Sequence, residues 1–397
     1  MQMDDLDIRS WLRLLLTPGI GNDSAHRLWT RFGSIQGIFE ASELQWSEVI
    51  SRAQIEALHH EPALLNAHFA RTMQWLSAKP HAAYAQRAVW PLGHPNYPEP
   101  LLHLTDPPLL LFVEGQVQQS LGPAISVVGS RNPTPQGRQT AMQFGRALGE
   151  AGLCVVSGMA LGIDGAAHQG ALQSITPPST TSSILGAGTS TPSSIYWTTV
   201  GVVGTGLDRI YPKHHLALAQ EVMAHGVLIS EYPLGTPPLA ANFPQRNRLI
   251  AALGLGTLVV EAAMRSGSLI TARMALDMGR EVMAVPGSIH AMQSHGCHWL
   301  IRQGAKLVEN VQDILEELHI PTTTDPSNRP NSSDSQQSET AHPVLDHMGF
   351  APISLDALQM QCNLETSVLQ SELLNLELMG CIARLPGGFF QRLVTTA

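Results

Sequence analysis

The sequence predicts an α/β protein with a doubly wound parallel sheet at its centre, an all-helical domain before the sheet and a winged-helix domain after it. Three observations predict this arrangement. Short apolar runs alternate with helical stretches between residues 121 and 310, which is typical of a parallel sheet covered on both faces. Residues 1–80 show only helical spacing, and residues 343–397 show helices followed by a two-strand hairpin pattern.

The first domain, residues 1–80, is expected to be helical because Trp11, Leu12 and Leu15 recur at helix spacing. A Pro-Gly-Ile-Gly turn at 18–21 separates two of its helices. This turn resembles a helix-hairpin-helix, whose backbone amides hold a DNA phosphate. The charges nearby are mixed, which favours the alternative, a plain helical packing or protein-interaction module.

The second domain, residues 81–318, is expected to begin with a Pro-rich irregular connector over residues 81–120. Its sheet then follows from the apolar runs and the amphipathic stretches between them. The predicted strands are 125–128, 154–157, 200–203, 227–229, 258–261 and 282–285, and the predicted helices are 136–149, 165–172, 215–225 and 269–278.

Three further segments complete the chain. Residues 174–199 are rich in Ser and Thr and carry no charge. They stand where ~2–6 residues usually suffice, so they are interpreted as an inserted flexible loop. Residues 319–342 are rich in Pro, Ser, Thr and Asn and are predicted to be a flexible linker. Residues 343–397 are predicted to be the winged helix, with its longest helix at 366–379.

The composition excludes several classes of protein. No lysine stands in a Walker A loop, so a P-loop ATPase is not expected. The four cysteines have no CxxC spacing, which argues against a zinc ribbon and fits a reducing compartment. The N-terminus has no signal-peptide pattern, and no run of ~18 apolar residues is present, so the expected location is the cytoplasm, away from any membrane.

The charge is unevenly distributed. The net charge of −9, taken alone, argues against nucleic acid as a partner. Residues 121–310, however, hold 12 basic and 9 acidic residues and are net +3. The acidic total comes from the flanking regions, the linker and the tail. This pattern favours DNA binding confined to one groove over coating of any polyanion.

Glycine and small polar residues follow the predicted strands, where ligands bind in a doubly wound sheet. Backbone N–H groups in such turns, and helix N-termini, attract anions. Arg131 and Lys213 would add full positive charge. The turns are Gly129-Ser130-Arg131, the stretch 158–168 that begins at Gly158, Gly204-Thr205-Gly206 with Tyr211-Pro212-Lys213, and the stretch 265–271 that contains Ser266-Gly267-Ser268.

A further motif, Phe-Pro-Gln-Arg-Asn-Arg at 243–248, lies between the fourth and fifth predicted strands. Arg246 and Arg248 flank Asn247 and follow Phe243, an order that suits a phosphodiester backbone with a base stacked nearby. The alternative is that both arginines form ion pairs with Glu231 and Glu261, which end two strands. Neither glutamate has a nucleophile or a paired acid beside it, so catalysis is not expected.

Other candidate sites have simpler interpretations. The dinucleotide fingerprint is absent, because position 209 is Arg where a third glycine would be needed. Asp164 is expected to be a helix N-cap, and His168 a core residue. A zinc site at His290, His295, Cys297 and His298 is disfavoured, because no second ligand pair or nearby carboxylate accompanies them.

Several long motifs, taken in order, closely resemble the DprA/Smf family (DNA processing protein A). The resemblance covers most of 90–310, and it rests on SGMALGIDGAAHQGAL, VGTGLDRIYPKHH, FPQRNRLIAAL, VVEAAMRSGSLITARMALDMGREVMAVPG and LIRQGAKLV. It implies an extended Rossmann-like domain, preceded by a helical domain similar to a sterile alpha motif and followed by a winged helix.

The resemblance implies a non-enzymatic protein without cofactor or metal. Members of this family bind single-stranded DNA with little sequence preference, protect it, and load the recombinase RecA onto it during natural transformation, as homodimers. The competing hypothesis is a related Rossmann-like enzyme that cleaves nucleoside monophosphates. The Gly-Gly-x-Gly-Thr loop of such enzymes, and the Glu that follows it, are not present at 265–268.

The family's phosphate contacts map onto particular turns of this chain. The resemblance implies phosphate contacts by Arg131, Lys213, Arg246, Arg248, Ser266, Gly267 and Ser268. The composition of the turns and of the motif at 243–248 adds Gly129, Ser130, Gly158 and Asn247 as predicted DNA contacts, and stacking by Phe243 is our own inference. The turn after Arg131 departs from the family pattern, because it continues Asn-Pro-Thr-Pro where Ser and a Tyr-Gly pair are usual. In the tail, residues 343–383 hold no Arg or Lys, so this winged helix is expected to contact protein rather than DNA.

Overall fold

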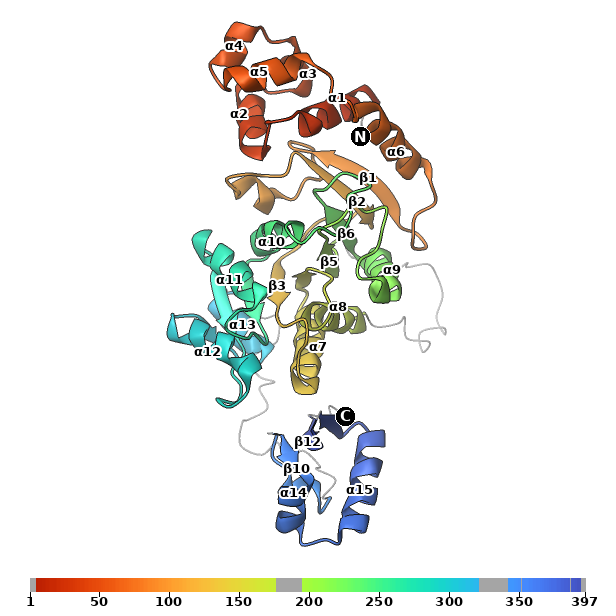
Figure 1. Cartoon of the computed structure of the whole chain (residues 1–397), viewed down its shortest axis with the longest axis vertical. Coiled ribbons are helices and arrows are strands. Elements are labelled where there is room, and N and C mark those ends of the chain that lie inside the picture. The colour runs from red at the N-terminus through yellow and green to blue at the C-terminus, as the bar shows by residue number, and fades with distance from the viewer. Residues whose placement is uncertain (1–4, 176–194, 321–341, 351, 386, 394–397) are drawn as a thin grey trace, which may run out of the picture.

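The computed structural model of the chain describes residues 5–175, 195–320, 342–350, 352–385 and 387–393. Figure 1 shows three parts along the long axis: a helical N-terminal region, a central sheet with its helices, and a small C-terminal unit. Most of the predicted insertion 174–199 and of the predicted linker 319–342 lies outside the described residues. No helix among the described residues is long and apolar enough to cross a membrane.

Six short helices form the N-terminal region. Their apolar faces meet in one core, in which Leu12, Leu28 and Leu58 are fully buried and the rings of Trp11 and Trp29 lie 5.0 Å apart. Ser34 and Ser42 cap two of the helices through side-chain oxygens. The helices are α1 (Asp5–Leu16), α2 (Asn22–Phe32), α3 (Ile35–Glu40), α4 (Glu43–Ser47), α5 (Arg52–His59) and α6 (Leu65–Ser77).

The central sheet has nine strands in the order β1-β2-β6-β5-β4-β3-β7-β8-β9. The strands from β6 to β9 run parallel to one another. The bounds are β1 (Gln86–Pro91), β2 (Leu110–Gly115), β3 (Ala124–Val128), β4 (Cys154–Ser157), β5 (Thr199–Val202), β6 (Val227–Ser230), β7 (Gly256–Val259), β8 (Glu281–Ala284) and β9 (Lys306–Leu307).

The prediction of an irregular connector over residues 81–120 is wrong. This segment holds β1 and β2, which extend the sheet in antiparallel fashion, with Phe112 opposite Ser230 of β6. The physical reason is that every residue of β2 is buried. Pairing with β6 therefore stabilises this apolar run more than an irregular conformation would. The prolines lie mainly outside the two strands, and Pro91 stands at the end of β1.

Helices cover both faces of the sheet. The predicted helices correspond to α7 (Pro135–Glu150), α8 (Ile163–Gln173), α9 (Leu216–His225) and α11 (Gly267–Asp277). The sequence did not predict α10 (Asn242–Leu253), which follows β6. Its proline, Pro244, lies in the first turn, where a missing N–H costs nothing. Further helices after β8 are α12 (His295–Arg302) and α13 (Val311–Glu317).

The strand order reverses beside β3, which lies between β4 and β7. The chain runs from β3 outward through β4, β5 and β6, and then returns to the other side of β3 as β7. At such a switch point the connections leave the two neighbouring strands on opposite faces, so a crevice opens at their carboxyl ends. The turns that follow β3 and β7 therefore line one crevice.

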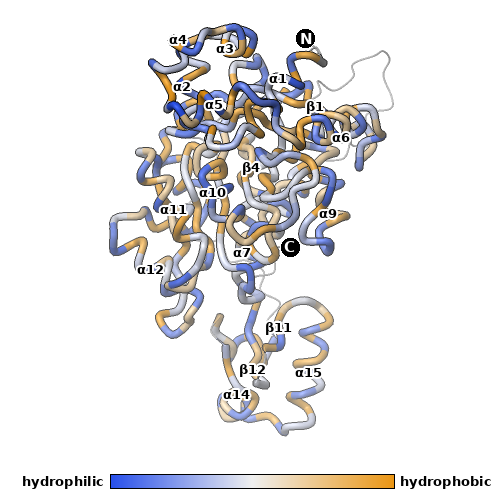
Figure 2. Tube along the Cα trace, turned by 45° about the horizontal axis from the view of Figure 1, so that its top comes forward, coloured by the Kyte–Doolittle hydropathy of each residue, from blue (hydrophilic) through white to orange (hydrophobic). Residues whose placement is uncertain are grey.

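The C-terminal unit is a winged helix with its own core of Leu358, Leu369, Leu373, Leu376, Ile382 and Phe390. Figure 2 shows hydrophobic and hydrophilic residues interspersed along its helices. It consists of β10 (Ile353–Ser354), α14 (Leu355–Cys362), α15 (Thr366–Leu378), β11 (Ile382–Leu385) and β12 (Phe389–Arg392). Together the three parts confirm the predicted fold class.

Candidate nucleic-acid interface

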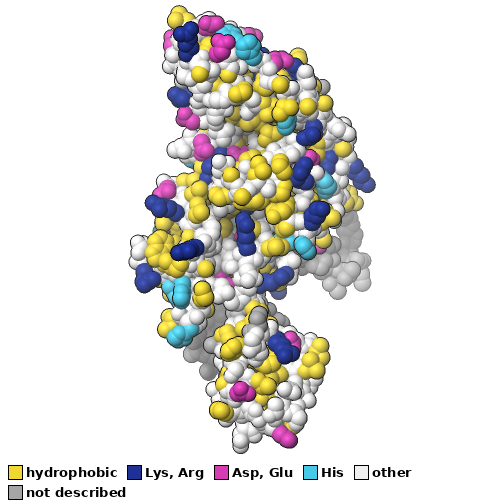
Figure 3. All heavy atoms as spheres, in the orientation of Figure 1, with side chains coloured by type: hydrophobic (Ala, Val, Ile, Leu, Met, Phe, Trp, Pro, Cys, Tyr) yellow, Lys and Arg dark blue, Asp and Glu magenta, His cyan; other side chains and the backbone are white. Residues whose placement is uncertain are grey.

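A groove of about 790 Å³ opens at the switch point, a volume within the usual range for ligand sites. A smaller pocket of about 80 Å³ adjoins it and shares Arg131, Phe243 and Arg246 with it. Among the residues predicted from the sequence, those that line the groove or the pocket are Gly129, Ser130, Arg131, Gly158, Phe243, Arg246, Asn247, Ser266, Gly267 and Ser268. On the face seen in Figure 3, most Lys and Arg side chains lie on the helical region and the central domain, and few lie on the winged helix.

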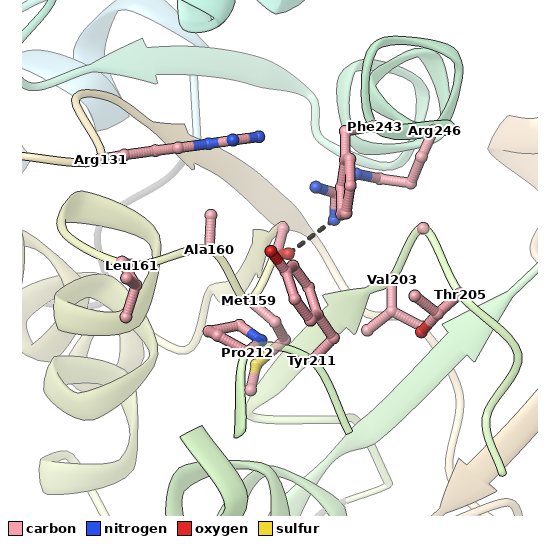
Figure 4. A pocket seen from close by; sticks show the side chains of 12 residues that line it. Arg131, Met159, Ala160, Leu161, Val203, Thr205, Tyr211, Pro212, Phe243 and Arg246 are labelled. Atoms are coloured by element: carbon pink, nitrogen blue, oxygen red, sulfur yellow. Dashed lines mark hydrogen bonds between the residues drawn. The ribbon is translucent and has the colours of Figure 1, made fainter. Parts of the chain in front are cut away.

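The turn after β3 presents Arg131 to solvent at the rim of the groove. The N–H of Ser130 donates to the carbonyl oxygen of Glu261, at 2.7 Å, which ties this turn to the segment after β7. The guanidinium of Arg131 lies 5.5 Å from the ring centre of Phe243, within cation–π range. Figure 4 shows Arg131 reaching across the pocket toward α10. An exposed cation held in this way is available to a phosphate.

Two aromatic rings face the pocket. Phe243, in the first turn of α10, lies 5.6 Å from Tyr211 with its ring tilted by 38°. Tyr211 is half exposed, at 46%, and Figure 4 shows its ring pointing into the pocket beside Phe243. Flat aromatic faces next to cations suit nucleotide bases, because stacking tolerates any base.

Arg246 is the buried cation of the site. Only 3% of the residue is exposed. One of its terminal nitrogens donates to the carbonyl oxygens of Gly158, at 2.6 Å, and of Val202. Its buried Nε has no hydrogen-bond partner in the described structure. Burial lowers the pKa of Arg246 to about 10, against the opposing effect of the Asp164 carboxylate, so the guanidinium stays charged at neutral pH.

Arg248 lies outside the groove. It donates to both carboxylate oxygens of Glu231, at 2.9 and 2.7 Å, and to Asp106 at 2.9 Å. It is not among the residues that line the groove. Of the two interpretations of Arg248, DNA contact and an ion pair with Glu231, the observed contacts favour the ion pair. The physical reason is helix geometry, because residues two apart on a helix do not share a face.

Lys213 also lies outside the groove lining. It begins the short 3-10 helix η2 (Lys213–His215) and is exposed. Its neighbours Tyr211 and Pro212 do line the pocket, so Lys213 stands just beyond the rim.

Ser266 caps α11, because its Oγ accepts from the N–H of Ser268 at 3.3 Å, while a Cβ on Gly267 would meet no atom within 4 Å. The start of α11 is therefore open.

Four residues that shape the groove were not among the predicted DNA contacts: Tyr211, Arg265, Asp164 and Glu261. Tyr211 and Arg265 line it and belong to turns whose neighbouring residues were predicted. Asp164 is not the N-cap of α8, a position that Gly162 holds. Its carboxylate instead accepts from the N–H groups of Gly158, at 3.2 Å, and Ala160, at 3.4 Å. Only the folded turn reveals this role.

His168 and Cys297 are buried in the core. His168 is fully buried and its Nδ1 lies 2.7 Å from the Thr199 hydroxyl, so it is a core residue, and burial lowers its pKa to about 3. Cys297 is buried behind β7, and its Sγ lies 3.6 Å from the Val259 carbonyl. No group of three or more His, Cys, Asp or Glu residues suited to a metal occurs within the described parts of the chain.

The comparisons with known proteins match the central sheet domain and the winged helix. A family model described as DNA recombination-mediator protein A matches residues 88–319, and a DprA winged-helix model matches residues 328–388. Protein Smf of Escherichia coli K12 is 36% identical over 97% of this chain and 96% of its own length. The DNA processing protein DprA of Bacillus subtilis is 39% identical over 60% of this chain and 74% of its own length.

A solved structure agrees. The X-ray structure of DNA processing protein A from Streptococcus pneumoniae superposes with a TM-score of 0.61 at 32% identity, covering 80% of this chain and 99% of that one. Sequence and fold thus lead to the same family over most of the chain. The chain belongs to the DprA/Smf family, the family of DNA recombination-mediator protein A.

Proposed function

We propose that this protein binds single-stranded DNA in the groove at the switch point. The observation that carries the proposal is the guanidinium of Arg246, which lines the groove while only 3% of the residue is exposed. Its contacts are backbone carbonyls, and its Nε is unpaired. A buried cation without a direct anionic partner is costly, and a phosphate oxygen entering the groove would relieve that cost.

The aromatic rings favour single strands over duplexes. Arg131, Phe243 and Tyr211 form a row in which each member lies less than 6 Å from the next. A base can stack on Phe243 only if its face is free, which a single strand permits and a duplex does not. Stacking on an aromatic face tolerates any base, so binding with little sequence preference is expected.

The carboxylates near the groove support a non-enzymatic role. Asp164 accepts from two backbone N–H groups, Glu261 accepts from the N–H and hydroxyl of Thr134, and Glu231 is paired with Arg248. Each acid is thus engaged in holding the structure, and none is free to act as a general acid or base. Release of free base from nucleoside monophosphates would support the competing hydrolase hypothesis, and we expect none.

We further propose the two protein partners that the family resemblance implies, RecA and a second copy of this chain. For the second copy, β9 is the last strand of the sheet, and within the described residues no other strand pairs with its outer edge. Leu307 of β9 is 42% exposed, and Trp299 of α12, the helix that precedes β9 in the chain, is 38% exposed. An unpaired edge with apolar neighbours is a usual place for strand addition. RecA would then act on DNA held by the dimer.

Fluorescence anisotropy with labelled oligo(dT) tests the DNA proposal. We expect tight binding to oligo(dT), weaker binding to a duplex of equal length, and a loss of about 0.7 in the slope of log affinity against log salt for Arg131→Ala. The matched control is Arg146→Ala, an arginine of α7 paired with Glu150 at 2.7 Å, which should leave the slope unchanged. Equal slopes for wild type and Arg131→Ala would exclude Arg131 as a phosphate ligand.

Light scattering tests the dimer. Leu307→Asp places a charge at the β9 edge and should convert a dimer to a monomer without lowering the melting temperature of the monomeric fold. Leu255→Asp, at another exposed apolar position, is the control and should leave the mass unchanged. RecA loading is tested with the same dimer variant, which should bind oligo(dT) yet fail to speed RecA filament formation on it.

A further inference from the structure

Two buried carboxylates occupy positions at which a Rossmann-like protein would bind phosphate. The first is Glu261, which follows β7 and is only 9% exposed. It accepts from the N–H of Thr134, at 2.9 Å, and from the Thr134 hydroxyl, at 2.5 Å. Thr134 is the N-cap of α7. Glu261 therefore places a negative charge at the helix N-terminus that follows the first parallel strand, where anions are ordinarily attracted.

Gly137 shows how closely Glu261 fits. A Cβ on Gly137 would lie 2.1 Å from the carboxyl carbon of Glu261, so any side chain at this position would displace the carboxylate. The Gly137 N–H meanwhile donates to the Thr134 hydroxyl oxygen at 2.9 Å. The N–H groups of Gly137 and Arg138 are thus satisfied by Thr134, and the Glu261 carboxylate fills the space that a phosphate would need at this turn.

Asp164 fills the turn after β4 in the same way. It is 8% exposed and accepts from the N–H groups of Gly158 and Ala160. A Cβ on Gly158 would lie 2.7 Å from both the Asp164 carboxylate and the Arg246 guanidinium. The side chains of Asp164 and Arg246 therefore pack against this turn from two sides, and its amides are not available to an external anion.

The turn before α11 is different. Its space is open around Gly267, and the hydroxyls of Ser266 and Ser268 lie 2.6 Å apart within the groove. Arg131 and Arg265, both exposed, line the same groove. No carboxylate is among the residues that line the groove on this side, where Ala263, Arg265 and Thr271 are the neighbours.

We propose that Glu261 and Asp164 are internal substitutes for phosphate that determine where DNA enters the groove, an inference that rests on the proposed DNA binding. They close the turns at α7 and after β4 to phosphate, so that a DNA phosphate enters at the start of α11. Glu261 is also a positioning residue, because its backbone carbonyl and its carboxylate hold the two ends of the turn 130–134 that carries Arg131. The same charges repel the phosphates of free nucleotides from the turns that would otherwise bind them.

The first test uses the wild-type protein and needs no variant. Crystals soaked in sulfate are expected to show an anion at Ser266–Ser268 and none at Thr134 or at Gly158. A sulfate bound to the N–H groups of Thr134 or Gly158 would overturn the inference. Sulfate binding in the crystal does not depend on oligo(dT) binding. If the protein bound no DNA, the proposed function would be refuted, and the sulfate positions would still show which turns accept an anion.

The second test removes the carboxylate and restores it chemically. Glu261→Ala should weaken oligo(dT) binding about tenfold, because the turn that carries Arg131 loosens. Sodium acetate, compared with sodium chloride at equal ionic strength, should recover most of that loss in Glu261→Ala and should not change the wild type. A merely structural role would lower the melting temperature without a specific effect of acetate on DNA affinity.

Two results of the second test count against the inference: DNA affinity unchanged in Glu261→Ala, or recovery as large in chloride as in acetate. Thr134→Val is the companion variant, because it removes only the hydroxyl that donates to Glu261. It should give a smaller loss of affinity, one that acetate does not recover because the carboxylate is still present.

Discussion

Arg246 and Arg248 stand two residues apart on α10 and have opposite surroundings. Arg246 lines the groove, is bonded to backbone carbonyls, and has no carboxylate within ion-pair distance among the described residues. Arg248 faces the other side, where Glu231 and Asp106 hold it on both edges of its guanidinium. The charge of Arg246 is offset by Asp164, which is not in direct ion-pair contact, whereas Arg248 has two direct carboxylate partners.

The difference teaches that a basic motif is not itself a binding site. Both arginines are cations in one short sequence, yet only Arg246, which has no direct ion pair, lines the groove. Arg248 instead joins three segments, since Asp106 lies in the connection before β2, Glu231 follows β6, and α10 carries the arginine. Burial raises the pKa of Glu231, against a smaller lowering effect of Asn22 in α2, so the helical region lies close to this cluster.

Removing Arg248 should give the largest effect, and the effect should be on stability. In Arg248→Met, Glu231 stays buried without its partner, and the free energy of unfolding should fall by about 3 kcal/mol. Urea denaturation followed by circular dichroism measures this change. Oligo(dT) affinity of the folded variant should stay within about twofold of wild type, since no phosphate contact is lost.

The double variant Arg248→Met with Glu231→Gln sharpens this prediction. It removes the unpaired charge, so it should recover part of the lost stability, because replacing both partners costs less than stranding one. If the single variant were as stable as wild type, the ion-pair interpretation of Arg248 would be wrong, and its charge would again be a candidate for DNA.

Arg246→Met should have its main effect on DNA affinity rather than on stability. It removes a charged donor from the groove and should weaken oligo(dT) binding by about 2 kcal/mol, roughly thirtyfold. Arg248→Met is the matched control, since the same substitution is made two residues away. Anisotropy titrations of both variants at equal salt, with melting curves for each, measure the contrast. Equal losses of affinity in the two variants would contradict the comparison.

The sequence predicted most of the fold because a buried parallel sheet leaves a strong local pattern. It missed β1 and β2, because the pairing of β2 with β6 is a long-range contact that no local pattern reports. It also missed α10, although the helical spacing of Leu249, Ile250 and Leu253 is readable afterwards. Had α10 been predicted, helix geometry alone would have separated Arg246 from Arg248.

The candidate site was predicted less completely than the fold. The turns at Gly129–Arg131 and Ser266–Ser268 were found because glycine and small polar residues after strands are a general signal. The roles of Asp164 and Glu261 could not be found in this way, because a carboxylate that caps a distant turn is defined only by tertiary contact. Gly137 carried a hint, since a glycine in the first turn of a helix often marks a close approach.

Phe243→Leu should have a smaller effect than Arg246→Met. The substitution keeps an apolar side chain but removes the aromatic face that lies between Arg131 and Tyr211. Loss of one stacking surface should cost about 1 kcal/mol, roughly fivefold in oligo(dT) affinity, with an unchanged salt slope. Phe243→Tyr keeps the face and should bind as wild type does. A steeper or flatter salt slope in Phe243→Leu would mean that the ring acts through Arg131 rather than through a base.

Lys213 should give the smallest effect, because it is exposed and stands beyond the rim of the groove. If its side chain reaches a phosphate outside the groove, Lys213→Ala should lower affinity about threefold and reduce the salt slope by about 0.7, the value for one contact on a single strand. Lys306→Ala is the control, since Lys306 is paired with Glu317 at 2.8 Å on β9, and it should change neither quantity. An unchanged slope in Lys213→Ala would limit phosphate binding to the cations that line the groove, the buried Arg246 and the exposed Arg131 and Arg265.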